Sequence, residues 1–491
     1  MMLERFLAAA ALAALSASAG WAASDRITLG MVLEPPNLDP TGNAAAAIDE
    51  VVYANLFEGL TRIGPDGSVA PGLASSWDVT EGGASYVFHL RPGVSFHDGT
   101  GFDAQDVIFS LDRARGADST NAQKALFEGI DKVEAVDPQT VRVTLKAPDG
   151  GFPFKMAWGD AVMVAPESAA SNATKPVGTG PFRFEEWGQG NHITLTAFDG
   201  YWGEKPMLKS ATFRFVPDPS AAYAAIMAGD IDAFPIYPAP ETLAQIEADP
   251  RFKVLVGTTE GETILAMNHK HPALADIKVR EAIAHALNRS EIIEGAMFGY
   301  GTPIGTHFAP HNPDYVDLTA KSGHDPERAK ALLAEAGAEN LTLRLALPPT
   351  PYARRGGEII QAELAAVGIK TEITNMEWAQ WLEQVFKNAD FDLTVISHVE
   401  PMDIGIYARD GYYFNYANQE FARVMAELGA ATEPAARSDL LKKAQEILAD
   451  DYANGFLFQL AKTGVAKAGI EGLWENAPMP ANDLTKVRWS E

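Results

Sequence analysis

The sequence predicts an α/β protein built from two lobes. Strand patterns at 341–347, 369–374 and 391–396 alternate with helical patterns at 357–367 and 378–386, the order expected of α/β units around an open sheet. The chain has 491 residues, and single hydrophobic cores stop growing beyond roughly 250–300 residues. A chain of this length therefore needs more than one core.

Two segments of the second half carry clear helix signals. Apolar residues recur at helical spacing on one face of the first: Val279, Ala282, Ile283, Ala286 and Leu287. Ser290 is the expected N-cap of the helix that follows. Further along, Asp325 precedes Pro326, and Gly337 closes an apolar stripe. An acidic N-cap, a first-turn proline and a terminal glycine in this order predict a helix between them.

The first half is richer in strands and turns. Alternating apolar residues predict strands at 27–32, 140–145 and 193–197, and a helical pattern occupies 44–56. Between the last two strands, residues 176–182 contain two Gly and two Pro. These residue types restrict the backbone, so the segment is predicted to be a fixed loop.

The first 23 residues have the pattern of an export signal. Arg5 supplies a positive charge, residues 6–19 are rich in Ala and Leu, and Ala19 and Ala22 suit signal-peptidase cleavage. A membrane anchor is the alternative, but a span needs roughly 18 or more apolar residues. No Cys follows the run to carry a lipid. We therefore expect a mature protein that lies free in the periplasm, without a lipid anchor.

The composition narrows the class of protein. The formal net charge is −26 and no Lys/Arg-rich run occurs, so we expect no binding to nucleic acid or anionic lipid. The absence of Cys excludes disulfides, thiolate metal sites and Cys nucleophiles. Motifs of serine hydrolases, zinc proteases, P-loop proteins and dinucleotide-binding proteins are missing. Asp230 and Asp232 could serve hydrolysis only by converging in a cleft, so a hydrolase is the last of the alternatives.

One stretch is more distinctive than the rest. Residues 71–111 read PGLASSWDVTEGGASYVFHLRPGVSFHDGTGFDAQDVIFSL. They predict a Pro-Gly turn, a strand through Tyr86 and Phe88, a tight turn at His97 and an acid-capped helix start at Asp103. The stretch resembles, nearly position for position, the signature of bacterial extracellular solute-binding proteins of family 5. Those proteins deliver peptides, opines or nickel to ABC importers.

Further segments resemble the same family, and the resemblance implies an architecture. The segments are the loop at 176–182, Tyr201-Trp202-Gly203 and the turn at 229–232. The implied fold is the two-lobed type II periplasmic binding protein fold, with an extra subdomain in lobe I. The implied boundaries are a signal peptide at 1–23, lobe I at 24–260 with its subdomain at about 51–175, lobe II at 261–463, and a return to lobe I at 464–491.

The resemblance also implies a ligand site in lobe II. From Arg354 to Asp403 the chain follows the pattern of dipeptide binders without a gap. Where those proteins hold the ligand α-amine with an acid, this chain has Glu400, and Asp403 matches a second acid. Where they place an arginine for the α-carboxylate, this chain has Thr350. Arg354 or Arg355 could replace that arginine, because a guanidinium fork suits a carboxylate; a solvated helix start is the alternative.

Other polar and aromatic residues are expected at the same cleft. Tyr352, Trp378 and His398 lie near these residues in the sequence, and Asn268 resembles an asparagine that faces the cleft in relatives. Trp378 is also spaced with Trp381 for packing in a core, which is the alternative for this residue. The predicted ligand-binding residues are Glu400, Asp403, Tyr352, Arg354, Arg355, Asn268, His398 and Trp378.

The class of solute stays open. The acids favour a short peptide or another amine-bearing solute, whereas the missing arginine and the many aromatics leave an oligosaccharide or opine as the second interpretation. A nickel chelate comes third, because His269/His271 and His307/His311 are closely spaced pairs. We predict no protein metal site and no cofactor. The expected partners are the solute and an inner-membrane ABC permease, and the protein is expected to be a monomer.

Overall fold

The computed structural model describes residues 24–42 and 45–490. The predicted export signal, residues 1–23, lies outside the described residues. Within the described ranges, no helix combines the length and the apolar character that crossing a membrane requires.

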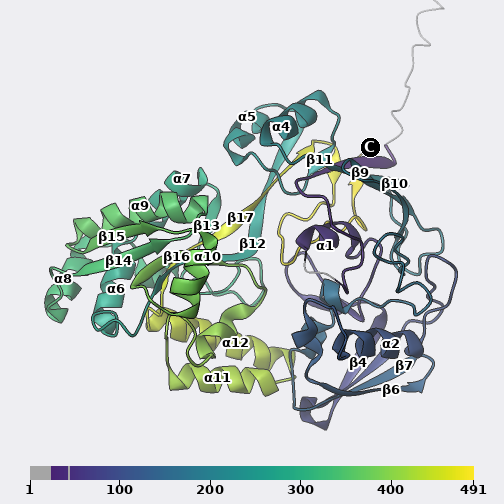
Figure 1. Ribbon diagram of the computed structural model, residues 1–491, viewed down its shortest axis with the longest axis horizontal. Coiled ribbons are helices and arrows are strands. Elements are labelled where there is room, and N and C mark those ends of the chain that lie inside the picture. Colours follow the sequence, from purple (N-terminus) through teal and green to yellow (C-terminus); the bar gives the residue numbers. More distant parts are fainter. Residues whose placement is uncertain (1–23, 43–44, 491) are drawn as a thin grey trace, which may run out of the picture.

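Two long strands join two lobes (Figure 1). We call residues 24–251 and 468–490 lobe I, and residues 268–454 lobe II. The crossing strands are β12 (Phe252–Met267) and β17 (Gly455–Lys467). Separate clusters of buried apolar side chains lie on the two sides of this crossing. The protein therefore has several cores, as its length requires.

The crossing strands belong to a sheet that extends through both lobes. Its order is β15-β14-β16-β12-β17-β11-β1-β10-β9-β8, and β13 pairs with β17 off this path. In lobe II, β14 is parallel to β15 and β16; in lobe I, β1 is parallel to β10 and β11. The other strands of this sheet have the bounds β1 (Arg26–Met31), β8 (Phe182–Gly188), β9 (His192–Ala197), β10 (Ser210–Phe215), β11 (Ala233–Phe234), β13 (Gly301–Pro303), β14 (Thr342–Leu347), β15 (Lys370–Asn375) and β16 (Leu393–His398).

The pairing of β12 with β17 is interrupted between the lobes. The antiparallel register holds up to Thr258, resumes at Glu262, and shifts between these two residues. A shift of this kind leaves residues unpaired and bends the strand. The interruption, residues 259–261, is therefore the point at which the ladder joining the lobes is weakest.

Lobe I contains a subdomain with its own sheet and core. Its strand order is β4-β5-β7-β6, antiparallel throughout, and α2 packs against β6 and β7. The side chain of Asp103 caps α2 by accepting from the backbone N–H of Gln105. The helices and remaining strands of lobe I are α1 (Ala46–Val52), β2 (Thr61–Ile63), β3 (Val69–Pro71), β4 (Ala74–Thr80), β5 (Ser85–Leu90), α2 (Ala104–Arg115), β6 (Ile130–Asp137), β7 (Thr140–Leu145), α3 (Phe152–Lys155), α4 (Pro219–Ala228), α5 (Leu243–Glu247), β18 (Ile470–Glu471) and β19 (Arg488–Trp489).

Lobe II is the more helical part. Its helices α6, α7, α8 and α9 share one apolar core with β14 and β16. A second core lies under α11 and α12. The helices have the bounds α6 (Ile277–Ala286), α7 (Arg289–Met297), α8 (Pro326–Ala336), α9 (Pro351–Ala366), α10 (Trp378–Trp381), α11 (Gln419–Ala430) and α12 (Pro434–Asp450), and short 3-10 and π turns include η6 (Leu382–Lys387) and η7 (Asp403–Ala408).

A buried carboxylate joins two of the segments that resemble the family signature. Glu58 is only 8% exposed. It accepts hydrogen bonds from the hydroxyls of Thr179 and Tyr201 and from the indole N–H of Trp202, each at 2.9 Å. Burial raises the pKa of Glu58, although these three hydrogen bonds act in the opposite direction. Glu58 thus fixes the loop at 176–182 to the core of lobe I.

His97 holds the same loop from the other side. Its Nδ1 accepts from the backbone N–H of Gly178 at 3.2 Å, so its Nε2–H donates to the carbonyl oxygen of Gly180 at 3.0 Å. These two contacts define one neutral tautomer. Burial lowers the pKa of His97 to about 4. The signature residue His97 is therefore a structural residue of lobe I.

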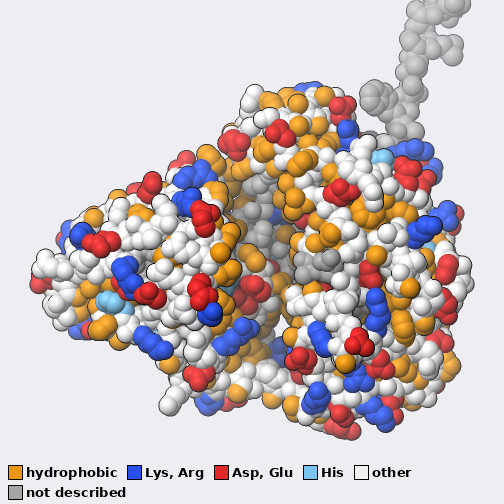
Figure 2. Space-filling model, in the orientation of Figure 1, with side chains coloured by type: hydrophobic (Ala, Val, Ile, Leu, Met, Phe, Trp, Pro, Cys, Tyr) orange, Lys and Arg blue, Asp and Glu red, His pale blue; other side chains and the backbone are white. Residues whose placement is uncertain are grey.

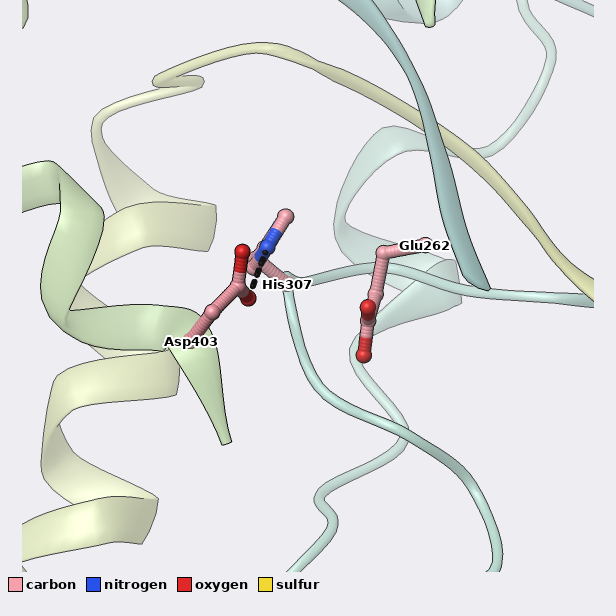
Figure 3. Close-up of side chains that lie close together, drawn as sticks. All are labelled: Glu262, His307 and Asp403. Carbon is pink, nitrogen blue, oxygen red and sulfur yellow. Dashed lines mark hydrogen bonds and ion pairs between the residues drawn. The ribbon is translucent and has the colours of Figure 1, made fainter. Parts of the chain in front are cut away.

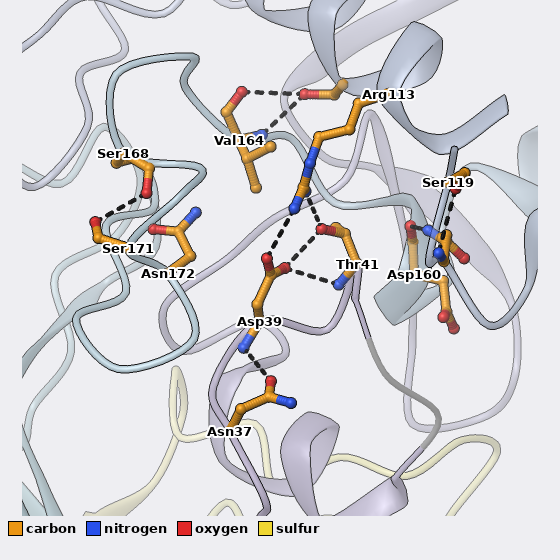
Figure 4. Close-up of polar contacts among 12 residues, drawn as sticks. Asn37, Asp39, Thr41, Arg113, Ser119, Asp160, Val164, Ser168, Ser171 and Asn172 are labelled. Carbon is orange, nitrogen blue, oxygen red and sulfur yellow. Dashed lines mark hydrogen bonds and ion pairs between the residues drawn. The ribbon is translucent and has the colours of Figure 1, made fainter. Parts of the chain in front are cut away.

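The N-terminal loop of lobe I is held by a polar network (Figure 4). Asp39 accepts from the backbone N–H and hydroxyl of Thr41, and its other carboxylate oxygen pairs with Arg113 of α2 at 3.1 Å. Arg113 also donates to the hydroxyl of Thr41. The loop after β1 is thus attached to the subdomain through one ion pair and shared hydrogen bonds.

Helix ends follow the sequence signals in one case and depart from them in another. In α8, the Asp325 carboxylate accepts from the backbone N–H of Arg328, and Gly337 has a φ of +63°. The prediction for α8 is confirmed. The N-cap of α7 is Asn288, whose side chain accepts from Glu291, and the prediction of Ser290 as the cap is wrong. An amide oxygen is as good a cap acceptor as a hydroxyl.

Candidate functional site

A cleft separates the two lobes and receives side chains from both. It encloses about 520 Å³, and Figure 2 shows the hollow between the lobes. The lobe I wall comprises α1 and the segments 236–240 and 477–481; the lobe II wall comprises the end of α7, the start of α9 and the segment after β16. Residues 259–261 and 460–463 of the crossing strands form the floor. The cleft therefore lies directly over the interrupted part of the ladder.

The walls expose several large apolar side chains. Ile236 of lobe I and Phe298 and Val399 of lobe II are 43%, 46% and 59% exposed. Phe298 has a φ of +57°, a conformation that costs free energy for a bulky residue and is over-represented at functional sites. Exposed apolar groups on facing walls favour an occupant with an apolar body.

Of the residues that the structure describes, four charged ones line the cleft, namely Glu50, Glu260, Arg355 and Lys462. Glu260 pairs with His311 at 2.8 Å. Lys462 donates to the carbonyl oxygen of Trp474, and burial lowers its pKa to about 8. Burial raises the pKa of Glu50, and the nearby Lys462 opposes this effect. Glu260 and Lys462 therefore already have interaction partners within the protein.

The structure separates the two arginines that the sequence left as alternatives. Arg355 lines the cleft, and its guanidinium lies 4.7 Å from the ring centroid of Phe298. Among the described residues it has no hydrogen-bond or ion-pair partner. Arg354 donates to a Glu377 carboxylate oxygen at 3.1 Å and lies outside the cleft lining. Arg355 is thus the arginine that is available to an occupant.

The two predicted acids have different surroundings. Glu400 is exposed between two cleft residues, Val399 and Pro401, and accepts from the backbone N–H of Val399 at 3.2 Å. Met402 then takes a left-handed φ of +59°. This turn sends Asp403 into the protein, where it is 8% exposed and pairs with His307 at 2.7 Å. Glu400 is therefore exposed next to the cleft wall without being part of the lining itself, whereas the side chain of Asp403 is buried.

Asp403 is held in its ionised form by two imidazoles. Burial alone would raise the pKa of Asp403, but His307 and His398 outweigh that effect and lower it well below the usual range. The Nδ1 of His398 lies 3.5 Å from Oδ2 of Asp403, and its Nε2 is 3.1 Å from the hydroxyl of Tyr413. His398 is 7% exposed and does not line the cleft.

The remaining predicted residues divide between wall and interior. Tyr352 lines the cleft, and its hydroxyl oxygen accepts from the backbone N–H of Ser397 at 3.2 Å. Asn268 is buried, donates to the carbonyl oxygens of Ala389 and Phe391, and lies outside the cleft lining. Its amide is used to hold the end of β12 in lobe II.

Trp378 also lies outside the cleft lining. It is 43% exposed and packs edge to face with Trp381, with ring centroids 5.8 Å apart. Of the eight predicted ligand residues, the structure places Tyr352 and Arg355 in the wall and Glu400 between two wall residues. The other five are either exposed elsewhere or committed to contacts within the protein.

None of the residues predicted from the sequence belongs to the lobe I wall of the cleft. Glu50 and residues 477–481 lie far apart in the sequence but on the same wall. Asn482 links them: its amide donates to the carbonyl oxygen of Glu50 at 3.0 Å, and its own carbonyl oxygen accepts from the amide of Asn55 at 2.9 Å. The regular helix pattern around Glu50 gave no sign that one of its faces borders a cavity. Phe298 could have been found, because it follows a helix at a Phe-Gly pair that ends the pattern.

Curated proteins with similar sequences are named for the peptides they bind. The chain is 34% identical to the dipeptide-binding protein of Escherichia coli K12 over 384 residues, which cover 71% of this chain and 70% of that protein. It is 33% identical to the glutathione-binding protein GsiB of Pectobacterium atrosepticum over 392 residues, covering 78% and 75% of the two chains.

Solved structures share the whole fold. HbpA2 from Haemophilus parasuis superimposes with a TM-score of 0.87 at 23% identity, over 95% of this chain and 100% of that one. AgaA from A. tumefaciens R10, in complex with agropinic acid, gives a TM-score of 0.70 at 27% identity, over 95% and 99%. The chain thus has the predicted two-lobed type II periplasmic binding protein fold, in which lobe I carries an additional subdomain.

The family assignment follows from sequence and fold together. Residues 68–419 match the model of the bacterial extracellular solute-binding proteins, family 5. This range contains the whole signature stretch at 71–111, the loop at 176–182 and the segment from Arg354 to Asp403. The predicted resemblance is confirmed: the chain belongs to the bacterial extracellular solute-binding proteins of family 5.

Proposed function

We propose that this protein captures a short peptide, or another small solute with an amine and a carboxylate, in the periplasm. It then presents the solute to an inner-membrane ABC permease. The observation that carries the proposal is Arg355, a cleft guanidinium with no partner among the described residues, on the same wall as the exposed acid Glu400. The names of the relatives support this class of solute.

Closure of the lobes supplies the mechanism. A solute that touches both walls favours the closed state by its extra contacts there, and that state is the one presented to the permease. The ladder between the lobes is interrupted at residues 259–261, which suits a hinge at the cleft floor. We propose that the lobes rotate as units about β12 and β17, with the boundaries near residues 260 and 463.

Recognition of the carboxylate is assigned to Arg355. Its guanidinium presents paired N–H donors that match the two oxygens of a carboxylate. The Phe298 ring beneath it orients the planar group. Thr350, at the position of the arginine found in dipeptide binders, is the helix-preceding residue of α9. Arg355, five residues later, lies on α9 itself and lines the cleft.

Recognition of the amine is assigned to Glu400. A carboxylate at a closing cleft loses water, so it must gain a partner or remain an uncompensated charge. A solute ammonium supplies that partner. Asp403 is already paired with His307 and is not needed for this contact. Tyr352 contributes an apolar ring beside these two groups.

Two experiments test the proposal. Native mass spectrometry of freshly purified protein should reveal a co-purified mass, and a thermal-shift screen of peptides, opines, oligosaccharides and nickel should give one class of hits. A ligand at a hundredfold excess over Kd stabilises the folded state by about 2.7 kcal/mol. The solute should be released unchanged, since we propose no enzymatic activity, and sedimentation should show a monomer.

The variant Glu400→Gln tests the amine contact. A lost charge-assisted hydrogen bond is worth roughly 1.5–3 kcal/mol, so calorimetry with the best hit should show affinity weakened about ten- to a hundredfold. Glu377→Gln, an exposed acid outside the cleft lining, is the matched control. Equal affinity of wild type and Glu400→Gln would contradict recognition of a solute amine by Glu400. An opine or oligosaccharide would then be the favoured class of solute.

A further inference from the structure

A second group of polar side chains lies behind the lobe II wall, beneath Glu400. Glu262 of β12, His307 of the loop after β13 and Asp403 of η7 converge there (Figure 3). One donor atom from each lies within 4.8 Å of the others. Glu262 is 3% exposed and His307 is fully buried. These three residues come from segments far apart in the sequence, so the fold itself assembles the group.

Nitrogen and oxygen donors are concentrated around Asp403. Its Oδ1 lies 2.7 Å from Nε2 of His307, and its Oδ2 lies 3.5 Å from Nδ1 of His398. With Glu262 the set comprises two imidazoles and two carboxylates. Imidazole and carboxylate ligands without thiolates suit divalent first-row cations such as Zn²⁺.

Glu262 is the member of this group whose hydrogen-bonding capacity is left unfilled. Its Oε2 is completely buried and has no hydrogen-bond partner among the described residues; the side chain of its cross-strand neighbour Gln459 lies close enough to stabilise its charge in part. Asp403 and Glu260 lie close enough to repel its negative charge. A buried carboxylate without a partner is costly, so it needs a cation or a proton.

The surroundings provide outer support for a cation ligand. The Nδ1 of His307 faces the hydroxyl of Tyr407 at 3.4 Å, and that hydroxyl accepts from the Asn454 amide at 2.9 Å. Hydrogen bonds of this kind fix the orientation of a ligating imidazole. The enclosed space next to these residues has no room for a water molecule. An organic solute is therefore excluded there, whereas a bare ion bonded directly to its ligands is not.

A route from the cleft leads to the same group. Glu400, His398 and Asp403 form a second set of donor atoms within 4.8 Å of one another. Asp403 is common to both sets, and Glu400 is exposed. A cation arriving at Glu400 therefore has a continuous series of donors leading inward to Glu262.

We propose that Glu262, His307, Asp403 and His398 form a binding site for one divalent first-row cation of the Zn²⁺ type, separate from the solute cleft. Its ligands would be Nε2 of His307, Nδ1 of His398 and carboxylate oxygens of Asp403 and Glu262. Because metal ligands lie about 2.0–2.2 Å from Zn²⁺, Nε2 of His307 and Oδ1 of Asp403, now 2.7 Å apart, must separate slightly on binding, and the Glu262 carboxylate must move toward them. The rival explanation is a protonated Glu262 that donates to Oε1 of Gln459, its cross-strand neighbour.

Zinc titration of tag-free, chelator-treated protein, without any solute, tests the site. Calorimetry should show one Zn²⁺ per chain, and Co²⁺ should give the visible absorption of a low-coordinate N/O site. His307→Gln and Asp403→Asn should each weaken Zn²⁺ binding more than about 100-fold, since losing even an outer partner costs 10- to 100-fold. His192→Gln is the control, because His192 pairs with Glu186 at 2.7 Å on the surface.

Each outcome decides the proposal. Circular dichroism and melting curves establish that the variants are folded, and either folded variant suffices for the comparison. No Zn²⁺ binding by the wild type overturns the site and supports the protonated Glu262. Binding that survives unchanged in a folded variant also overturns it. Because no solute is present, neither result bears on solute capture.

Discussion

The backbone N–H of Gly150 in lobe I donates a hydrogen bond to the carbonyl oxygen of Gly429 in lobe II, at 2.9 Å. Figure 1 shows α11 of lobe II reaching the subdomain of lobe I, away from the crossing strands. Nearby, Arg437 donates to the carbonyl oxygen of Ala431. The lobes therefore also contact each other at Gly150 and Gly429, away from the crossing strands. A rotation that moves these two segments apart must break this hydrogen bond.

Replacement of Gly150 by Ala should separate the lobes at this contact. An added Cβ would lie 1.6 Å from the Ala431 carbonyl oxygen, whereas the same change at Gly151 meets nothing closer than 3.3 Å. Because the chain has no Cys, a pair of introduced cysteines can carry spin labels on the two lobes. We expect a longer inter-lobe distance in Gly150→Ala and an unchanged one in Gly151→Ala; identical distances in both would contradict the prediction.

Replacement of Arg355 by Gln should weaken binding of any solute that carries a carboxylate. Among the described residues the guanidinium has no hydrogen-bond or ion-pair partner and loses only its contact with the Phe298 ring, so the melting temperature without solute should barely change. Loss of a charge-assisted contact of roughly 1.5–3 kcal/mol corresponds to about a ten- to hundredfold weaker affinity. Arg354→Gln, whose parent side chain pairs with Glu377, is the control. Calorimetry with esterified and free-acid forms of the best hit shows whether the carboxylate is responsible.

Stability should depend on pH through His97. Its pKa falls from 6.5 to about 4 on folding because of burial, so between these values the unfolded chain binds more protons. The stabilising contribution is complete above pH 6.5 and is lost as the pH falls toward 4, by about 3 kcal/mol in total. Urea unfolding at several pH values should show a smaller loss in His97→Gln than in the wild type.

Buried acids, among them Asp106 and Asp160, change stability in the opposite direction within the same window. Burial raises the pKa of Asp106 and Asp160 to about 6, so their contributions decline as the pH rises. They are present in both proteins, and the difference between wild type and His97→Gln isolates the histidine. Parallel pH profiles for the two proteins would show that His97 is not buried in its neutral form.

Glu58→Gln should destabilise the fold although it preserves shape. The carboxylate accepts three hydrogen bonds, and an amide group brings its own donors against at least one of those partners. A buried donor left without an acceptor costs roughly 1–3 kcal/mol. Urea denaturation should show this loss, and Glu128→Gln on the exposed surface should show almost none.

The sequence predicted helix ends and strand bounds well where they depend on residues within a few positions of one another. The ends of α8 depend on Asp325 and Gly337, which act within a few residues of their own positions, and β7 has the predicted bounds 140–145. α9 begins at Pro351 rather than at 357, because a proline in the first turn suits a helix start as well as a loop. The predicted helix at 378–386 is a short α-helix continued by a π-helical segment.

The candidate site depended on contacts that no local pattern reports. Arg354 and Arg355 are adjacent, and only the packing of α9 decides that one meets Glu377 and the other enters the cleft. The sequence suggested His307 and His311 as a pair of metal ligands. In the structure His307 pairs with Asp403, and His311 pairs with Glu260. Such partners lie about 50 to 100 residues away, beyond the reach of spacing rules.

The interleaving of the lobes along the chain has a consequence for how the molecule is assembled. Lobe II and the adjoining ends of β12 and β17 form one continuous segment of the chain, so the core of lobe II is built from that segment. Lobe I is complete only when residues 468–490 have folded onto it, because Asn55 forms hydrogen bonds with the backbone of both Asn482 and Leu484. Contacts of such long sequence separation form slowly. Since residues 477–481 also line the cleft, the binding surface is completed only when the final residues have docked.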